Sequence, residues 1–122
     1  MILDSDIIIY SALPQSEYLR DFIESNLFYY SAVSQIEVLG FHRISDYDAK
    51  YFAEFFASLT VIAISEQIIS RAISLRQRHK INLGDSVIAA SALEYNLALV
   101  TNNRKDFDWI DDLSLINPLE NE

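Results

Sequence analysis

The sequence contains no cysteine, which excludes disulfide bonds and thiolate metal sites. It has only two glycines and two prolines, and it shows no low-complexity run and no internal repeat. No apolar stretch approaches the length that a transmembrane helix requires. The N-terminus carries acidic residues and lacks a basic segment, which argues against a secretory signal. We therefore expect a cytoplasmic protein with no membrane partner.

Basic residues are also scarce, because nine Lys and Arg stand against eighteen Asp and Glu, for a net charge of −9. Such a chain is a weak general binder of nucleic acid, since phosphate affinity comes largely from Lys and Arg. The charge still permits a nucleic-acid enzyme, because clustered carboxylates raise the acidic count and a bound cation offsets part of it. Apolar residues make up 51% of the chain, enough for a substantial core, and the length suits one domain spanning residues 1–122.

Short apolar runs alternate with amphipathic segments along the whole chain. The runs that predict strands are residues 2–3, 27–30, 60–64, 97–100 and 113–116. Between them the apolar spacing predicts helices, and in the one after Ser65 the inward residues would be Ile68, Ile69, Ala72, Ile73 and Leu75. Strands separated by helices predict an α/β fold: a three-layer α/β/α arrangement with a central, mainly parallel sheet of four to five strands.

Four acidic residues lie where a strand-like run gives way to a helix, namely Asp4, Glu37, Asp85 and Asp106. The carboxyl ends of parallel strands share one edge of a sheet, and ligands bind at that edge. Carboxylates that meet there would repel one another, and a hard divalent cation with oxygen ligands would relieve the repulsion. The pattern therefore predicts metal-dependent chemistry on phosphate groups.

Each acid taken alone has a simpler explanation as a helix cap. Asp4 and Asp85 could stabilise the first turn of a helix. Glu37 lies three residues after Ser34, at capping-box spacing, and Asp106 lies at the same distance from a preceding Asn. Capping does not require an acid at four junctions, however, because Ser, Thr and Asn also cap helices. A charge directly after the buried run that ends at Asp4 is costly unless it is paired, and a cation is the simplest partner.

The ligand types favour Mg²⁺ or Mn²⁺ as this cation. Zinc is disfavoured because there is no Cys, and His42 and His79 lie outside the acidic segments. The basic residues leave alternatives open. Those beside Asp106 are candidate substrate contacts or offset nearby acids, and those of residues 71–80 are an RNA contact or, as we favour, a solvated face.

Four segments carry the acids: residues 3–9 (LDSDIII), 34–40 (SQIEVLG), 84–93 (GDSVIAASAL) and 101–107 (TNNRKDF). In this order and at this spacing they resemble the four motif blocks of PIN-domain ribonucleases. The subgroup they resemble most is the VapC-type toxins of type II toxin–antitoxin pairs. The resemblance spans residues 2–118, so it implies a PIN-like domain over nearly the whole chain.

The resemblance implies a catalytic site of six residues: Asp4, Glu37, Asp85, Asp106, Thr101 and Asn103. The four acids would bind Mg²⁺ or Mn²⁺, and the two polar residues would position ligands, water or the last acid. One departure from the family pattern is Asp6, where a neutral residue such as Asn is usual. This extra carboxylate could join the cluster, but we expect it to face solvent or to form a local cap.

The function that the resemblance implies is a metal-dependent endoribonuclease that hydrolyses RNA phosphodiester bonds, as the toxin of a toxin–antitoxin pair. It also implies a homodimer and a groove for a cognate antitoxin protein. A surplus of aromatic residues would suit such a surface: Tyr47, Tyr51, Phe52, Phe55 and Phe56. Two alternatives stay open, a catalytically weak PIN-like module that binds RNA or protein, and a phosphatase or DNA nuclease of related architecture.

Overall fold

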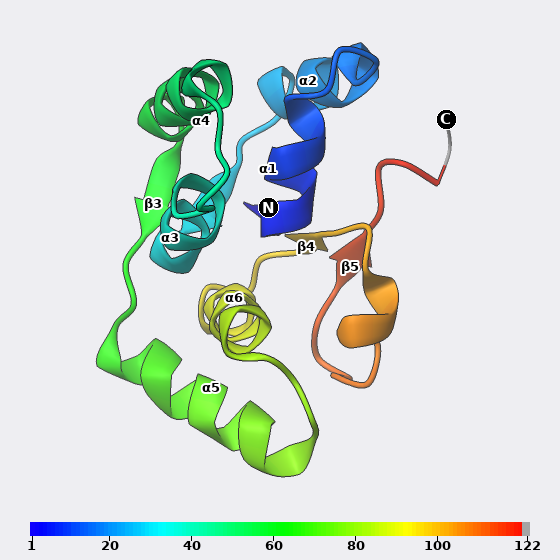
Figure 1. The fold of residues 1–122 in the computed structure, drawn as a ribbon. Coiled ribbons are helices and arrows are strands. Elements are labelled where there is room, and N and C mark those ends of the chain that lie inside the picture. The colour runs from blue at the N-terminus through cyan, green and yellow to red at the C-terminus, as the bar shows by residue number, and fades with distance from the viewer. Residues whose placement is uncertain (121–122) are drawn as a thin grey trace.

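A five-stranded sheet, parallel throughout, forms the centre of the protein in a computed structural model that describes residues 1–120 (Figure 1). Its strands are β1 (Ile2–Leu3), β2 (Tyr29–Ser31), β3 (Thr60–Ile62), β4 (Leu99–Val100) and β5 (Leu115–Ile116). They lie in the order β3-β2-β1-β4-β5. This arrangement confirms the predicted three-layer α/β/α fold, although every strand except β1 is shorter than the apolar run that predicted it.

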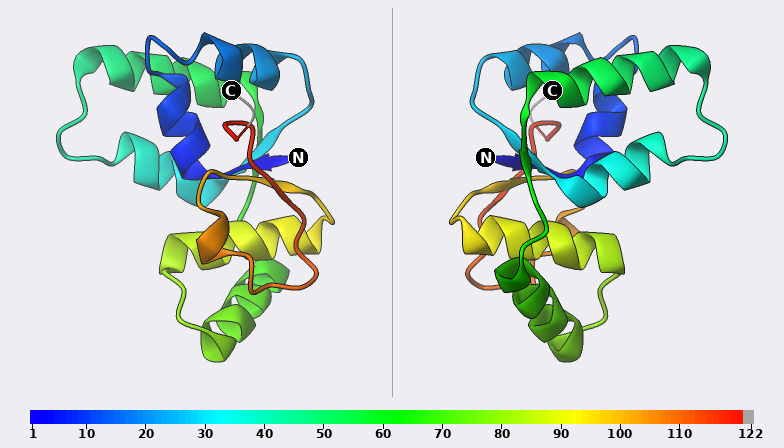
Figure 2. Two further views of the ribbon diagram at one scale, coloured as in Figure 1. Left: turned by 90° about the vertical axis from the view of Figure 1, so that its right-hand side faces the viewer. Right: turned by 90° about the vertical axis from the view of Figure 1, so that its left-hand side faces the viewer.

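Helices cover both faces of the sheet (Figure 2). One layer contains α1 (Ser5–Ser11), α2 (Glu17–Glu24), α3 (Ala32–Leu39) and α4 (Asp46–Ser58). The opposite layer contains α5 (Glu66–Arg78), α6 (Leu83–Glu94) and the short 3-10 helix η1 (Arg104–Asp106). Among residues 1–120, no helix has both the length and the apolar character that crossing a membrane requires.

The core divides into two halves because side chains alternate along each strand. Ile2 and Leu99 point to the face covered by α5 and α6, whereas Leu3 and Val100 point to the face covered by α1 to α4. All four side chains are completely buried. Burial of the central strands β1 and β4 on both faces explains why they read as continuous apolar runs rather than as alternating ones.

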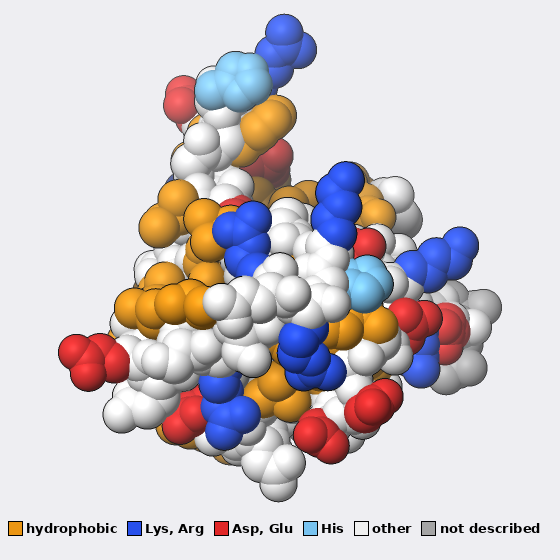
Figure 3. Space-filling model, turned by 90° about the horizontal axis from the view of Figure 1, so that it is seen from below, with side chains coloured by type: hydrophobic (Ala, Val, Ile, Leu, Met, Phe, Trp, Pro, Cys, Tyr) orange, Lys and Arg blue, Asp and Glu red, His pale blue; other side chains and the backbone are white. Residues whose placement is uncertain are grey.

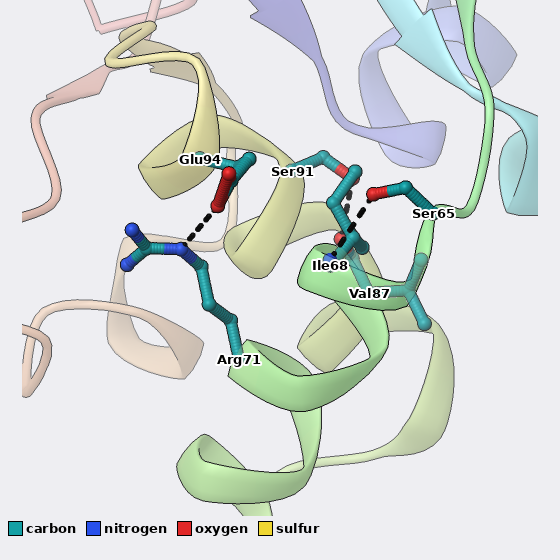
Figure 4. A network of polar contacts seen from close by, with 6 residues as sticks. All are labelled: Ser65, Ile68, Arg71, Val87, Ser91 and Glu94. Atoms are coloured by element: carbon teal, nitrogen blue, oxygen red, sulfur yellow. Dashed lines mark hydrogen bonds and ion pairs between the residues drawn. The ribbon is translucent and has the colours of Figure 1, made fainter.

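Helix α5 is the outermost element of its layer, and it packs against α6 (Figure 4). Ser65 caps it by accepting a hydrogen bond from the Ile68 N–H at 3.2 Å. The ion pair from Arg71 Nε to Glu94 Oε2, at 2.6 Å, joins it to α6. The prediction that Ile69 and Ile73 point inward is wrong, since they are 46% and 53% exposed. A helix that contacts the protein along one side buries only a narrow stripe, and here that stripe is Ile68, Ala72 and Leu75.

The start of α3 bears on the suggested capping box of Ser34 and Glu37. Ser31 is the N-cap, and its hydroxyl accepts a hydrogen bond from the Val33 N–H at 3.2 Å. Ser34 therefore lies inside the helix, where it is completely buried. Glu37 consequently belongs to no capping box, and the simpler explanation for this acid is wrong.

Candidate active site

The order of the strands reverses between β1 and β4. From β1 the chain continues outward to β2 and β3, and it later returns to place β4 and β5 on the other side. Ligands of α/β proteins bind at such a switch point, beyond the carboxyl ends of the strands. Asp4 directly follows β1 and Thr101 directly follows β4, so these two residues flank the switch point. The Thr101 hydroxyl donates to Asp4 Oδ2 at 2.8 Å and joins the two strand ends.

Asp4 is a buried carboxylate, with only 4% of its surface exposed. It is the N-cap of α1, and its Oδ1 accepts a hydrogen bond from the Ser5 N–H at 2.8 Å. Burial raises the pKa of Asp4 to about 8, and the negative charges of Asp6 and Asp85 add to this rise. The hydrogen bonds from Thr101 and Ser5 oppose it only in part. Asp4 therefore caps a helix and is also an acid whose ionisation is costly.

Asp6 lies beside Asp4 in the same cluster. Its Oδ1 accepts from the Ile7 N–H at 2.7 Å, which agrees with the expected local cap. Its Oδ2 accepts from the Asn102 N–H at 3.0 Å. The residue is half-buried, so it is not simply a solvent-facing carboxylate. Burial is the largest cause that raises the pKa of Asp6. Asp6 thus ties the start of α1 to the loop after β4 and adds a fifth carboxylate to the site.

Glu37 reaches the cluster from α3 and remains solvent-exposed. The Ser5 hydroxyl donates to Glu37 Oε1 at 2.8 Å and lies 2.9 Å from the Ser34 hydroxyl. On its other side the carboxylate lies against Gly84, where any Cβ atom would collide with it. The Ser5 hydroxyl therefore orients the Glu37 carboxylate, and the missing side chain of Gly84 leaves room for it between α1 and α6.

Asp85 lies in the first turn of α6, as predicted, and Asn82 is the N-cap of that helix. Asn82 Oδ1 accepts from the Asp85 N–H at 2.8 Å, and Asn82 Nδ2 donates to Asp85 Oδ2 at 2.9 Å. Burial, followed by the charges of Asp106 and Glu37, raises the pKa of Asp85 to about 6. Asp85 therefore interacts electrostatically with two carboxylates from other elements, Glu37 of α3 and Asp106 of η1.

Asp106 is exposed at the end of η1, and its charge acts on Asp85 and on Asp6. The simpler explanation for Asp106, that it belongs to a helix cap formed with Asn103, is wrong. The Asn103 side chain makes no capping hydrogen bond. Asn103 instead contributes its backbone, whose N–H donates to Thr101 Oγ1 at 3.0 Å. The Thr101 hydroxyl thus lies between Asn103 and Asp4.

The donor set of this site is made of carboxylate oxygens. Within residues 1–120 the only ion pair joins Arg71 to Glu94, so the clustered acids have no side-chain cation as a partner. In the same part of the chain, no three Asp, Glu or His side chains approach closely enough to enclose an ion by themselves. Mg²⁺ is commonly bound through one or two carboxylates and keeps several water ligands, so the open arrangement fits it. The closed N and S cage of structural zinc does not match this donor set.

Four further residues shape the site and were not among the predicted ones: Ser5, Ser34, Asn82 and Gly84. Each left a local signal in the sequence. Ser5 directly follows Asp4, Ser34 lies one helical turn before Glu37, and Asn82 precedes Asp85 at capping distance. Gly84 lies within a helix, where glycine is unfavourable unless a close approach requires it.

The sequence matches the PIN domain family over residues 1–113, and the chain belongs to this family. A toxin–antitoxin complex from Klebsiella pneumoniae is 26% identical, with a TM-score of 0.77 and 96% of each chain covered. VapBC2 from Rickettsia felis, bound to a promoter DNA fragment, is 23% identical with a TM-score of 0.83, covering 95% of this chain and 96% of that one. DNA-bound VapBC from Salmonella typhimurium is 20% identical, with a TM-score of 0.85 and 96% of each chain covered.

A comparison with curated protein sequences gives no match. The family and the similar structures confirm the resemblance that the four acidic segments suggested. PIN domains are generally nucleases that use divalent metals, so the family supports a hydrolase with endonuclease chemistry. The acidic cluster lies at the switch point where such chemistry would take place.

Proposed function

We propose that this chain is a metal-dependent endoribonuclease that hydrolyses RNA phosphodiester bonds. The observation that carries the proposal is the buried Asp4, gathered with Asp6, Glu37, Asp85 and Asp106 at the carboxyl edge of the sheet. These acids interact with one another and form no ion pair within residues 1–120. A site built from repelling carboxylates favours a divalent cation, Mg²⁺ or Mn²⁺, and with it an anionic substrate.

Asp4, Glu37, Asp85 and Asp106 are the residues that would hold the cation, with Asp6 beside them. When bound, a divalent cation supplies neutralisation of the scissile phosphate and acidifies water. Thr101 fixes one oxygen of Asp4 and Ser5 fixes one oxygen of Glu37, so both carboxylates are oriented before substrate arrives. This orientation lowers the cost of reorganisation during the reaction.

Glu37 and Asp106 are the exposed acids of the cluster, and either could orient the attacking water. The water oxygen would bond to phosphorus in line with the leaving ribose oxygen, and its proton would pass to the orienting carboxylate. The phosphorus–oxygen bond to the leaving ribose would break, and that oxygen would take a proton from solvent. Asp4, buried and fixed by two hydrogen bonds, is better placed to anchor than to exchange protons.

We further propose that the enzyme is the cytoplasmic toxin of a toxin–antitoxin pair, a single PIN-like domain over residues 1–122 that acts as a homodimer. Its partners would be RNA and a cognate antitoxin protein. Of the aromatic surplus, Phe52 and Phe56 belong to the core, whereas Tyr51 and Phe55 line a hollow of about 560 Å³ between α2 and α4. This hollow is a candidate seat for an antitoxin segment. The similar structures from Klebsiella pneumoniae and Rickettsia felis, which are toxin–antitoxin complexes, support the same partner.

Cleavage of RNA by the purified protein, with Mg²⁺ or Mn²⁺ and with chelator, tests the proposal. Asp85→Asn and Asp4→Asn should each lower kcat/KM by about 100-fold or more, because they remove charge from the site. Asp21→Asn is the control, since it removes an exposed acid of α2. Cleavage by Asp85→Asn at the wild-type rate would contradict the proposal. Metal-dependent RNA binding without cleavage would instead favour the catalytically weak binding module.

A further inference from the structure

The few basic residues of this acidic chain are concentrated in one region. Six of its nine Lys and Arg lie on α5, on the loop after it, or on η1: Arg71, Arg76, Arg78, Lys80, Arg104 and Lys105. Figure 3 views the protein from the side of α5 and shows Lys and Arg side chains spread across this face, with acids among them. Within residues 1–120 only Arg71 forms an ion pair, so the other five charges are available to an anionic partner.

Two of these cations share a hollow with the acidic cluster. The hollow measures about 260 Å³, and Lys80 and Lys105 line it together with Asp85 and Asp106. The two lysines come from different segments, the loop between α5 and α6 and the helix η1. Acids alone would repel a nucleic-acid strand, whereas adjacent cations attract its phosphates. The hollow therefore offers cations to a strand at the point where it would reach the carboxylates.

An aromatic stack holds these two segments together. The His79 ring stacks on Trp109 with centroids 4.4 Å apart and planes at 12°, and Arg78 lies 5.7 Å from the centre of the Trp109 ring. The Trp109 Nε1–H donates to the Asp106 carbonyl at 3.0 Å, which ties the stack to η1. His79 Nδ1 lies 3.0 Å from the Lys80 carbonyl oxygen. The stack thus fixes the backbone beside both lysines.

We propose that Lys80 and Lys105 form a phosphate clamp that binds the backbone of an RNA strand next to the scissile phosphate, with the His79–Trp109 stack as its positioning element. The inference rests on the proposed nuclease function and names the residues that bring the strand to its site. An ammonium group binds phosphate as a compact point charge, so two lysines from two segments suit two successive phosphates. The clamp also explains how a chain with a net charge of −9 can bind an anionic substrate.

RNA binding in chelator, where cleavage is suppressed, tests the clamp. Fluorescence anisotropy with a labelled single-stranded RNA oligonucleotide gives Kd at several salt concentrations. The double variant Lys80→Ala/Lys105→Ala should raise Kd by about 10-fold or more and reduce the slope of log K against log salt by roughly 1.4, about 0.7 for each lost phosphate contact. The matched control is Arg43→Ala/Lys50→Ala, which removes two exposed cations from the opposite layer and changes the net charge equally. Equal effects of the two double variants, or no effect of either, would overturn the clamp.

Cleavage assays with Mg²⁺ separate failure of the clamp from failure of the nuclease proposal. If the wild type cleaves RNA, Asp85→Asn does not, and the lysine variant matches its control, the clamp is wrong and the nuclease stands. If no protein cleaves RNA but the lysine variant alone loses binding, the two lysines bind RNA in a module that does not cleave it. If cleavage is found and the lysine variant alone has a higher KM with little change in kcat, both hold.

The positioning role of the stack has its own variants. His79→Ala removes the stack, whereas His79→Phe can restore it without the imidazole nitrogens. The first should weaken RNA binding several-fold although both lysines remain, and the second should recover most of the loss. Thermal melting measured in parallel should differ little between the two variants. Wild-type affinity in His79→Ala would show that the stack does not position the clamp.

Discussion

Replacing Asp4 by Asn tests whether an uncompensated charge is buried at the edge of the sheet. The substitution keeps the shape of the side chain and an acceptor for the Ser5 N–H, but it removes the charge. Burial and then repulsion from Asp6 raise the pKa of Asp4 from 3.8 to about 8. Between these pH values the folded protein holds a proton that the unfolded chain has lost. The stability of the cation-free protein should therefore fall as the pH rises from about 4 to about 8.

The pKa change sets the size of this effect. The rise from 3.8 to about 8 corresponds to roughly 5 to 6 kcal/mol of unfolding free energy. Asn recovers only part of it, because its NH₂ group replaces an acceptor in a buried position. We expect Asp4→Asn to stabilise the cation-free protein by about 3 kcal/mol at pH 8, which raises Tm by about 10 °C. At pH 5 the wild-type Asp4 is already protonated, so the substitution should shift Tm by only about 2 °C or less.

Thermal melts in chelator at pH 5 and pH 8 measure this difference directly. Asp21→Asn is the matched control, because it removes the same charge from an exposed position on α2. A gain in Tm at pH 8 no larger than the shift at pH 5, or an equal gain in Asp21→Asn at pH 8, would refute the reasoning. Adding Mn²⁺ at pH 8 should raise Tm in the wild type and much less in Asp4→Asn, because a cation relieves only a charge that is present.

Two other substitutions test the surroundings of the site, and a third tests the ion pair between α5 and α6. Gly84→Ala should keep or raise stability by up to about 1 kcal/mol through helix propensity, yet lower RNA cleavage by about 10-fold or more, because the new Cβ displaces the Glu37 carboxylate. Ser5→Ala should lower both cleavage and unfolding free energy, the latter by about 1 kcal/mol in denaturant titrations, because it removes the hydroxyl that holds Glu37. Arg71→Ala should cost less than about 1 kcal/mol in the same titrations, because its ion pair with Glu94 is exposed.

The position of Asp4 could be predicted because it depends on backbone pattern alone. A short apolar run followed by helical spacing gives the end of a buried strand, and the residue after it reaches the carboxyl edge of the sheet. Asp4 after β1 and Thr101 after β4 follow this rule. The same rule does not describe Glu37, which lies inside α3, or Asp85, whose helix α6 follows α5 rather than a strand. The parallel sheet and the helix layers on its two faces follow from the alternation of apolar runs with amphipathic segments. For this reason the fold class could be predicted in full.

The orientation of side chains could not be predicted in the same way. The second oxygen of Asp6 accepts from Asn102, almost a hundred positions away along the chain, and no local pattern carries that information. Ile69 and Ile73 have helical spacing that suits burial, but they are exposed because α5 packs mainly on α6, along one side. Amphipathic periodicity marks which residues could be buried, whereas the number of neighbouring elements decides how wide the buried stripe becomes.

The two explanations for Asp4, a helix cap and a metal ligand, are compatible, and their combination accounts for the energetics of the site. The hydrogen bonds from Ser5 and Thr101 each favour the ionised form, yet burial and the neighbouring acids outweigh them. A site that used these two bonds to neutralise Asp4 fully would have little free energy left with which to bind a cation. Because the compensation is incomplete, the folded protein retains a carboxyl group that is fixed in place and whose ionisation is costly without a positive partner. The instability of the empty site and its affinity for a divalent ion then have the same physical origin.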